Sequence, residues 1–489
     1  MAFSEGDDML AYEELQGAHG REIRYRPPRY DARAIFPHRP PRLRIGAAAY
    51  QIQNISLGGM AAITKDTAND DLAAGDTVRL TIQQAGLPIF ESEAKVRWAE
   101  KTIFGAKVAL SFVDRVMELE KLINRNLQAQ IATRASSAGA DIHALVPQEY
   151  RSFCSDVLKL LRGYRSLIDA NLSVPAEFTR DFDHIAVFEA CETQLVYEWR
   201  MLWRVGNDIV RSVMNERERR EAVKEYTELV LTPELRGGAI WDRSYGKPLG
   251  YPGDFSIMNQ VYDWQRVGSD AYQMLLHRLG LEVAECIKTR MEVVRGDIGK
   301  LVSAKDSARP ARVMSLGCGS AREVETWLAR SRSTPSRVEF TLIDQEQRAL
   351  DYAYRVSYPY VLRSDGRCRL NCLHISFTDV LRGTGGMEGL PPQDLIYSVG
   401  LLDYLTDRRA ASLVRRLYDL VIPGGLLIIG NMNETPLSNL WPMEFITDWT
   451  LYYRSDAQML AWTNGLDPAN AWTETECTDR VRLLYVRKR

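Results

Sequence analysis

Short stretches of alternating apolar and polar residues fill the chain from about residue 40 to residue 112. A period of two is typical of strands that bury one face, and six such stretches separated by turn residues predict a small antiparallel barrel. The expected strands are Arg42–Ile45, Tyr50–Ile55, Met60–Ile63, Thr77–Ile82, Phe90–Trp98 and Phe104–Phe112. We therefore expect an all-β domain over residues 21–114, after a weakly ordered lead-in over residues 1–20.

The period lengthens after residue 114, where apolar residues recur at spacings of three and four. This spacing predicts a helix over Asp114–Arg134, and a small, polar stretch completes a connecting helix and linker over residues 115–140. Residues 141–302 show helical spacing almost throughout, which predicts a central α-helical region. A loop that contains glycine and proline is expected at Gly237–Asp254.

Apolar runs alternate with helical stretches from residue 303 onward. The runs, each expected to be a strand, are Val313–Leu316, Phe340–Ile343, Asp394–Val399 and Leu426–Ile429. Alternating strands and helices predict a parallel sheet with helices on both faces, so residues 303–489 are expected to form an α/β, Rossmann-like domain. The sequence thus predicts a multidomain protein made of a six-stranded barrel, a helical region and an α/β domain.

Composition and charge narrow the possible partners. A net charge of −2 over 489 residues does not favour a nucleic-acid partner for the whole chain. Seven cysteines without a Cys-x-x-Cys pair favour reduced thiols in the cytoplasm and no metal site. We expect neither a signal peptide nor a transmembrane segment, because the required apolar runs are missing. Eight arginines against two acidic residues between Arg21 and Arg44 form either an anion-attracting segment or a solvated basic arm.

A buried strand that runs into Gly317-Cys318-Gly319, followed by a helix from about Ala321, predicts a cofactor site. The glycines let the backbone turn sharply, and free N–H groups at the start of the helix can bind a ligand. Asp344 ends the next strand, where an acid can accept hydrogen bonds from ribose hydroxyls. The dinucleotide pattern needs a glycine where Arg322 stands, and an arginine there disfavours the close approach of a pyrophosphate.

Residues 309–489 resemble the class I S-adenosylmethionine-dependent methyltransferases, whose loop commonly has the sequence Leu-Gly-Cys-Gly followed by a small residue. Further landmarks are His374–Leu381, where that family places an adenine contact, and Pro423–Gly425 before the fifth strand. Ser315 and Ala321 depart from the family's usual acid and third glycine. The resemblance implies that S-adenosyl-L-methionine is the cofactor and is bound by Leu316, Gly317, Cys318, Gly319, Asp344, Gln345, Phe377, Thr378, Ser398 and Gly400.

Residues 148–489, with the motif Lys247–Phe255, resemble a bacterial family that makes 3-hydroxypalmitic acid methyl ester, an extracellular quorum-sensing factor. The resemblance implies methyl transfer to the carboxylate of a hydroxy fatty acid or a similar small molecule. A carboxylate is already ionised at neutral pH and needs no general base, whereas a hydroxyl or an amine acceptor needs one. The candidate catalytic residues are Asp254, Asp403, Tyr404 and Arg454.

A cation is expected to position an acceptor carboxylate, with Arg454 as the first candidate and Lys247 as the second. A surface salt bridge is an equally good interpretation of Arg454. The segment Tyr245–Tyr262 is either a lid over the cofactor or a structured turn between helices. Other candidates at the expected strand ends, or for an acyl pocket that could equally be core, are Asn431, Asn433, Trp441, Trp449, Tyr452 and Tyr453.

Two short motifs mark the N-terminal domain: Arg29-x-x-x-Arg33 and, twenty residues on, Asn54-x-Ser56-x-x-Gly59. Both halves, in this order and ahead of a barrel pattern, resemble the PilZ domain, the bacterial receptor for cyclic di-GMP. Arginine side chains can clamp phosphates and the Hoogsteen edge of guanine, and glycine permits close approach. The resemblance implies that cyclic di-GMP is bound by Arg26, Arg29, Arg33, Asn54, Ser56 and Gly59.

Taken together, the motifs predict a cytoplasmic methyltransferase that responds to cyclic di-GMP, in which the dinucleotide changes methyl transfer by moving the barrel relative to the lid. One alternative is a non-catalytic signalling adaptor with a methyltransferase-like scaffold. Another keeps the enzyme but changes the acceptor to a hydroxyl, an amine or a protein side chain. The helical region also offers a surface through which two copies could form a homodimer.

Overall fold

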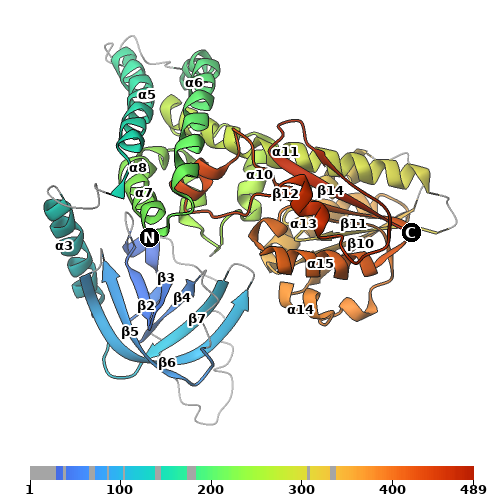
Figure 1. Ribbon diagram of the computed structural model, residues 1–489, viewed down its shortest axis with the longest axis horizontal. Coiled ribbons are helices and arrows are strands. Elements are labelled where there is room, and N and C mark those ends of the chain that lie inside the picture. Colours follow the sequence, from blue (N-terminus) through green and yellow to red (C-terminus); the bar gives the residue numbers. More distant parts are fainter. Residues whose placement is uncertain are drawn as a thin grey trace. The chain divides into compact units, whose positions relative to one another are not determined.

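A computed structural model describes residues 29–36, 40–64, 72–84, 87–102, 105–137, 145–172, 183–249, 251–305, 309–330 and 337–489 (Figure 1). The chain forms two compact units. The described residues within 1–99 and 107–131 form the first, and those within 100–106 and 132–489 form the second. No helix in these described ranges is long and apolar enough to cross a membrane.

The first unit is a closed barrel, as the alternating pattern predicts. Its strands are β2 (Arg42–Ile45), β3 (Ala48–Ser56), β4 (Gly59–Thr64), β5 (Thr77–Gln84), β6 (Leu87–Thr102) and β7 (Gly105–Phe112). The order β3-β2-β5-β6-β7-β4, with β4 also paired to β3, leaves no free edge. In β2 the exposed Arg42 and Arg44 alternate with the buried Leu43 and Ile45, which shows how the sequence pattern selects the barrel interior.

Three smaller elements complete this unit. The two-residue strand β1 (Tyr30–Asp31) pairs with β3, and a single helical turn, α2 (Ala32–Ile35), follows it. Helix α3 (Leu119–Ser137) begins five residues after the expected Asp114, and its Leu122 and Ala129 join the barrel core. The last residues of the expected linker, 138–140, lie outside the described ranges.

The second unit begins with helices, as predicted. They are α5 (Gln148–Leu172), α6 (His184–Val213), α7 (Arg217–Val230), α8 (Thr232–Leu235), α9 (Ala239–Gly246), α10 (Phe255–Asp263) and α11 (Ala271–Ala304). The expected loop over Gly237–Asp254 is therefore wrong in part, because α9 occupies half of it. The burial of Ile240 and Trp241 against α11 stabilises this helix more than the flanking glycines destabilise it. The two helices pack closely, because a Cβ on Gly280 of α11 would lie only 2.2 Å from Ile240.

A seven-stranded sheet follows, in the order β10-β9-β8-β11-β12-β14-β13. Its strands are β8 (Ala311–Leu316), β9 (Val338–Asp344), β10 (Cys368–His374), β11 (Gln393–Ser398), β12 (Val421–Met432), β13 (Pro468–Thr475) and β14 (Val481–Lys488). Strands β8 to β12 run parallel, and β14 runs antiparallel to β12. The strand order reverses between β8 and β11, which is the place where ligands bind in open α/β sheets.

Helices cover both faces of this sheet: α12 (Arg322–Arg330), α13 (Gln347–Leu362), α14 (Phe377–Arg382), α15 (Asp407–Asp419) and α16 (Asp456–Ala461). Successive residues of each strand point to opposite hydrophobic clusters. In β8, Val313 belongs to the cluster that includes α11 and α12, and Met314 to the one that includes α15. Short turns η1 (Met387–Gly389), η2 (Leu402–Tyr404) and the π-helical η3 (Trp441–Ile446) lie between these elements. The predicted α/β, Rossmann-like fold is confirmed.

Candidate cofactor and acceptor site

The loop from β8 to α12 carries three residues in the left-handed backbone region. Gly317 has φ +67°, Gly319 has φ +54°, and Ala321 has φ +48°. The N–H groups of Gly317 and Cys318 both donate to the carbonyl oxygen of Ile343, at 2.8 and 3.1 Å, so the loop folds back over the end of β9. Ala321 thus adopts a backbone conformation that favours glycine, although it is an alanine. The loop therefore keeps its shape even though position 321 lacks the usual third glycine.

Asp344 joins the end of β9 to this loop. Its carboxylate accepts hydrogen bonds from the N–H of Gly319 at 2.8 Å and from the N–H of Glu346 at 2.9 Å. Burial raises the pKa of Asp344, and the two N–H groups oppose that shift by stabilising the carboxylate. The acid predicted to bind the ribose therefore also shapes the loop.

A cavity of about 1080 Å³, including space open to solvent, lies in front of this loop. Eight of the predicted cofactor residues line it: Leu316, Gly317, Cys318, Gly319, Asp344, Gln345, Phe377 and Gly400. Ser398 does not line it, because its buried hydroxyl donates to the carbonyl oxygen of Leu316 at 2.9 Å and so supports the loop from behind. The backbone of Thr378 lies in α14, and its side chain is outside the described part of the chain.

Sequence reasoning missed several residues of this cavity, among them Tyr251, Tyr262, Arg290 and Glu323. Glu323 is buried in the first turn of α12, where burial raises its pKa and the Tyr397 hydroxyl donates to it at 2.7 Å. It supplies an acid to a cavity in which Ser315 stands in place of the usual one. An acidic residue just after the glycine loop was the available signal.

Arg322 does not line the cavity. Its guanidinium pairs with Asp263 at 3.0 Å and donates to Asn259 at 3.4 Å, which ties α12 to α10. The arginine that argues against a dinucleotide site is thus used for packing between two helices.

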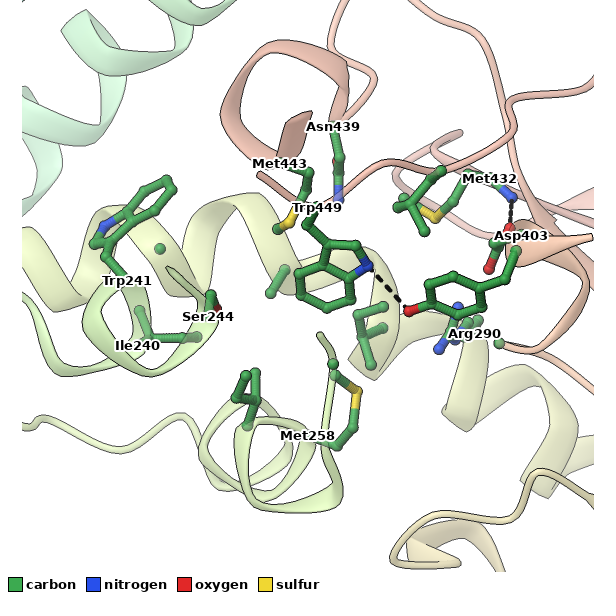
Figure 2. A pocket seen from close by; sticks show the side chains of 18 residues that line it. Ile240, Trp241, Ser244, Met258, Arg290, Asp403, Met432, Asn439, Met443 and Trp449 are labelled. Atoms are coloured by element: carbon green, nitrogen blue, oxygen red, sulfur yellow. Dashed lines mark hydrogen bonds between the residues drawn. The ribbon is translucent and has the colours of Figure 1, made fainter. Parts of the chain in front are cut away.

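A second cavity of about 650 Å³ adjoins the first and shares Gly253, Met258, Arg290, Gly400 and Tyr404 with it (Figure 2). Apolar side chains from α9, α10, α11 and the segment after β12 make up most of its wall. The residues that line only the second cavity are Ile240, Trp241, Ser244, Ile257, Gly280, Ala284, Ile287, Asp403, Met432, Asn439, Met443, Trp449 and Leu451. The Trp449 indole N–H donates to the Tyr404 hydroxyl at 3.0 Å. Figure 2 draws this bond as a dashed line from Trp449.

Asp403 and Tyr404, two of the candidate catalytic residues, line this second cavity. The Asp403 carboxylate accepts a hydrogen bond of 2.6 Å from the N–H of Met432. Burial raises the pKa of Asp403 to about 6, against the opposing charges of Arg290 and Arg454. Burial also raises the pKa of the Tyr404 phenol, so it is protonated at neutral pH.

Asp254 and Arg454, the other two candidates, line neither cavity. Asp254 caps α10 by accepting from the N–H groups of Ser256 and Ile257 at 2.9 and 3.1 Å, and it pairs with Arg243. Arg454 is 2% exposed rather than on the surface. Its guanidinium donates to Asp407, to Asn431 and to the carbonyl oxygens of Leu402 and Leu405. Both side chains therefore bind other groups of the protein next to the cavities.

The side chains of the remaining candidates contact other parts of the protein and do not line either cavity, with Trp449 as the exception. Lys247, which ends α9 in a left-handed conformation, donates to the Asp448 side chain at 3.1 Å. Asn433 donates to the carbonyl oxygen of Asp479 at 2.8 Å. Trp441 packs in the core among Phe153 and Trp199, Tyr453 is partly buried against the same core, and Tyr452 is half exposed. Of the four aromatic candidates, Trp449 is the one that lines either of the two cavities described above.

In the first unit, β1 brings the two short motifs together. Tyr30 and Asp31 pair with Ile55 and Asn54, so the exposed Arg29 lies at the end of β3 that carries Asn54 and Ser56. The Asn54 side-chain oxygen is buried and has no hydrogen-bond partner in the described part of the chain. Arg26, and the side chain of Arg33, lie outside the described residues.

Ser56 and Gly59 shape the β3–β4 turn. The Ser56 hydroxyl donates to the carbonyl oxygen of Gly59 at 3.1 Å. A Cβ on Gly59 would lie 2.2 Å from the carbonyl oxygen of Leu110, so glycine is needed for the close approach of β4 to β7. The packing of β4 against β7 is therefore enough to explain why residue 59 is a glycine, whether or not a ligand binds there.

Comparison with known proteins bears on each unit. Residues 24–129 match the PilZ domain family, so the first unit is a PilZ domain. No curated protein sequence matches the chain. One solved structure similar to part of the chain is a possible exported protein from Bordetella parapertussis, 21% identical, with a TM-score of 0.40 over 52% of this chain and 88% of that one.

Two methyltransferases are also similar in structure to part of the chain. One is magnesium protoporphyrin IX methyltransferase from Synechocystis with bound S-adenosylmethionine, 15% identical, with a TM-score of 0.30 over 42% of this chain and 84% of that one. The other is the N-methyltransferase NodS from Bradyrhizobium japonicum in complex with S-adenosylhomocysteine, 15% identical, with a TM-score of 0.28 over 40% and 86% of the two chains. Their acceptors do not carry over to this chain.

Proposed function

We propose that the second unit is an S-adenosylmethionine-dependent methyltransferase and that the PilZ unit makes it responsive to cyclic di-GMP. The observation that carries the first part is the Asp344 carboxylate, bonded to the glycine loop and lining a large cavity where the strand order reverses. A ligand with both hydroxyls and positive charge suits these walls.

The residues present fit S-adenosylmethionine in three respects. Asp344 keeps lone pairs for ribose hydroxyls beyond the two N–H groups it accepts from. Ile375 and Phe377 provide apolar surface for an adenine ring. Glu323 supplies a buried carboxyl group to the cavity of a cofactor that carries an ammonium and a sulfonium. When bound, the cofactor supplies an activated methyl group, so the protein mainly has to align an acceptor with it.

The second cavity is our candidate for the acceptor site, because it adjoins the first and shares five residues with it. Its wall is mostly apolar, with three methionines that can adapt to a flexible chain. We propose the carboxylate of a hydroxy fatty acid, or of a similar small molecule, as the acceptor. Such an acceptor requires no general base.

One observation favours a second candidate. Asp403 lines the acceptor cavity, and its raised pKa of about 6 is well placed for a general base near neutral pH. A hydroxyl or an amine acceptor would use this base. The pH dependence of the reaction distinguishes the two candidates, because only the second needs Asp403 ionised.

For the PilZ unit we propose cyclic di-GMP binding around Arg29 and Asn54. The exposed guanidinium suits a phosphate, and the buried, unpartnered Asn54 oxygen suits a donor on the ligand. Binding there is proposed to change the rate of methyl transfer in the second unit.

Calorimetry on the full chain tests the proposal in two steps. Titration with S-adenosylhomocysteine is expected to show one site per chain, and the absence of binding would favour the non-catalytic adaptor. The rate of methyl transfer is then measured with increasing cyclic di-GMP, and the same titration of an Arg29→Ala chain is the control. A rate that stays constant at saturating dinucleotide would contradict the regulatory part alone.

A further inference from the structure

We propose that Arg290, in the middle of α11, binds the carboxylate of the acceptor and so determines which acceptors the enzyme takes. Arg290 is 8% exposed and lines both cavities. In Figure 2 Arg290 lies on the same side of the acceptor cavity as Asp403. This inference rests on the methyl transfer proposed above, and it names the group that recognises the substrate.

The guanidinium has no partner among the residues that the structure describes: it forms neither a hydrogen bond nor an ion pair with any of them. Burying an arginine without a counter-charge is costly, and buried arginines are normally paired and hydrogen-bonded. Asp403 and Glu323 influence it through their charge, but neither lies within ion-pair distance. An anionic ligand at the junction of the cavities would supply the missing partner.

The neighbouring backbone leaves room for this side chain. A Cβ on Gly400, two residues after the end of β11, would lie 2.8 Å from a terminal nitrogen of Arg290. Any larger residue at position 400 would displace the guanidinium from the junction. Gly400 was predicted as a cofactor residue, and its proximity to Arg290 gives it a second role as the space that the arginine occupies.

The two other cations considered for the acceptor are already engaged. Arg454 donates to two carbonyl oxygens, Asn431 and Asp407, and Lys247 donates to Asp448. Neither lines the cofactor cavity or the acceptor cavity. Arg290 is the cationic side chain that the described part of the chain presents to both the cofactor cavity and the acceptor cavity.

The surroundings define a class of acceptor. Beyond Arg290, the polar side chains of the acceptor cavity are Ser244, Asp403, Tyr404 and Asn439. The Asn439 side-chain oxygen is buried without a hydrogen-bond partner among the described residues, so it can accept from a hydroxyl. We therefore infer a monocarboxylate with an apolar chain, to which a hydroxyl adds a favourable contact.

Atoms and charges balance in the proposed methyl transfer without the gain or loss of a proton. A carboxylate oxygen forms a bond to the methyl carbon with one of its lone pairs, and the carbon–sulfur bond breaks with its electron pair passing to sulfur. The cationic sulfonium and the anionic carboxylate become a neutral thioether and a neutral ester. Because the ester cannot form an ion pair with Arg290, the product binds more weakly than the acid, which favours its release.

The test uses full-length protein with Arg290→Gln and Arg290→Lys, and Arg295→Gln on the same helix as the matched control. The probes are 3-hydroxypalmitate with methyl-labelled S-adenosylmethionine, and two cofactor analogues for calorimetry. S-adenosylhomocysteine carries the amino-acid carboxylate, and 5′-methylthioadenosine lacks it. Circular dichroism establishes that each variant is folded.

We expect Arg290→Gln to raise the KM for 3-hydroxypalmitate by at least about tenfold, because a charge-assisted ion pair is lost. Arg290→Lys should raise this KM less, because it keeps the positive charge. The Kd for S-adenosylhomocysteine should change less than about threefold, with Arg295→Gln equal to wild type. A loss of affinity for S-adenosylhomocysteine but not for 5′-methylthioadenosine would overturn the inference and assign Arg290 to the cofactor carboxylate. Unchanged KM and Kd would overturn it as well.

Failure of the proposed function gives a different result. If wild-type protein does not bind S-adenosylhomocysteine, methyl transfer is excluded whatever Arg290 does. If the protein binds it but 3-hydroxypalmitate is not methylated, binding of that acid is followed by calorimetry. Arg290→Gln is then expected to weaken binding of the acid and not of its methyl ester, and equal binding of acid and ester by wild type would overturn the role of Arg290.

Discussion

The Asp344 carboxylate and the Gly319 N–H lie 2.8 Å apart, and this one hydrogen bond joins the end of β9 to the loop that follows β8. The same carboxylate lines the larger cavity, so it connects the shape of the loop to the binding of a ligand. An acid in this position both organises the site and offers acceptors for ribose hydroxyls.

Asp344→Ala is expected to weaken binding of S-adenosylhomocysteine by about 10- to 150-fold, because hydrogen bonds to a charged group are worth about 1.5–3 kcal/mol. Calorimetry measures the change, and Asp351→Ala, an exposed acid on α13, is the control. Equal affinities for wild type and Asp344→Ala would remove the acid from the cofactor site.

Asp403 predicts opposite pH profiles for the two kinds of acceptor. Burial raises its pKa to about 6, and the charges of Arg290 on α11 and of Arg454 after η3 oppose this rise. With a carboxylate acceptor, ionising Asp403 partly offsets the charge of Arg290, so kcat/KM should fall about threefold to tenfold as pH rises through 6. Rates at pH 5.5–8, with Asp403→Asn expected to flatten the profile, check this. A rise through pH 6 would instead indicate a general base and a hydroxyl or amine acceptor.

The same raised pKa affects stability with a definite sign. The folded state holds the Asp403 proton more tightly than the unfolded chain, so ionisation of this residue costs stability as pH rises from about 4 to about 6. Asp403→Asn keeps an oxygen for the Met432 N–H and should therefore stabilise the protein by up to about 3 kcal/mol above pH 7. Unfolding by denaturant at pH 4 and pH 8 measures the difference, and an equal effect at both pH values would contradict the assignment.

Arg29→Ala is expected to lower the affinity for cyclic di-GMP at least tenfold, since it removes a charge-assisted contact to phosphate. The side chain is exposed, so the thermal unfolding of the barrel should not change. Arg79→Ala, which removes an exposed arginine of β5 that pairs with the half-exposed Glu91, is the control for loss of charge. Binding is followed by calorimetry, and an affinity unchanged in Arg29→Ala would place the ligand elsewhere.

Arg454→Gln is expected to act on stability rather than on the acceptor. The guanidinium is buried and bonded to groups of η2, β12 and α15, so its loss should cost about 3–5 kcal/mol of unfolding free energy. Chemical denaturation measures this, and the KM for the acceptor is compared well below the melting temperature. A raised KM with unchanged stability would restore Arg454 as the residue that binds the acceptor.

Periodicity was enough to place most strands, because each has one buried face or lies fully inside. Strand β2 has the predicted bounds. Three of the four predicted strands of the parallel sheet fall within β8, β9 and β12, and the fourth, Asp394–Val399, ends one residue beyond β11. The strands that sequence reasoning did not predict include β10 and β13, which lie at the two edges of the sheet. An edge strand is only partly buried, so its sequence lacks the continuous apolar run that marks a central one.

The site was predictable where one short motif carries it, and not where distant segments meet. Gly317, Gly319 and Asp344 were identifiable because a strand, a turn and the next strand bring them together locally. Arg290 stands in a long helix rich in charged residues, and nothing in the sequence distinguishes it from Arg295. Only the packing of α11 against the end of β11 places one of them between two cavities and the other outside them.

The central claim is that this chain transfers a methyl group from S-adenosylmethionine to a carboxylate. The most direct measurement incubates the full chain with methyl-labelled S-adenosylmethionine and 3-hydroxypalmitate and then treats the extracted lipid with mild base. A methyl ester releases the label as volatile methanol, which is the result we predict, and Asp344→Ala should reduce the amount released. Label that stays in the lipid after base treatment, or no transfer of label to the acid at all, would contradict the account.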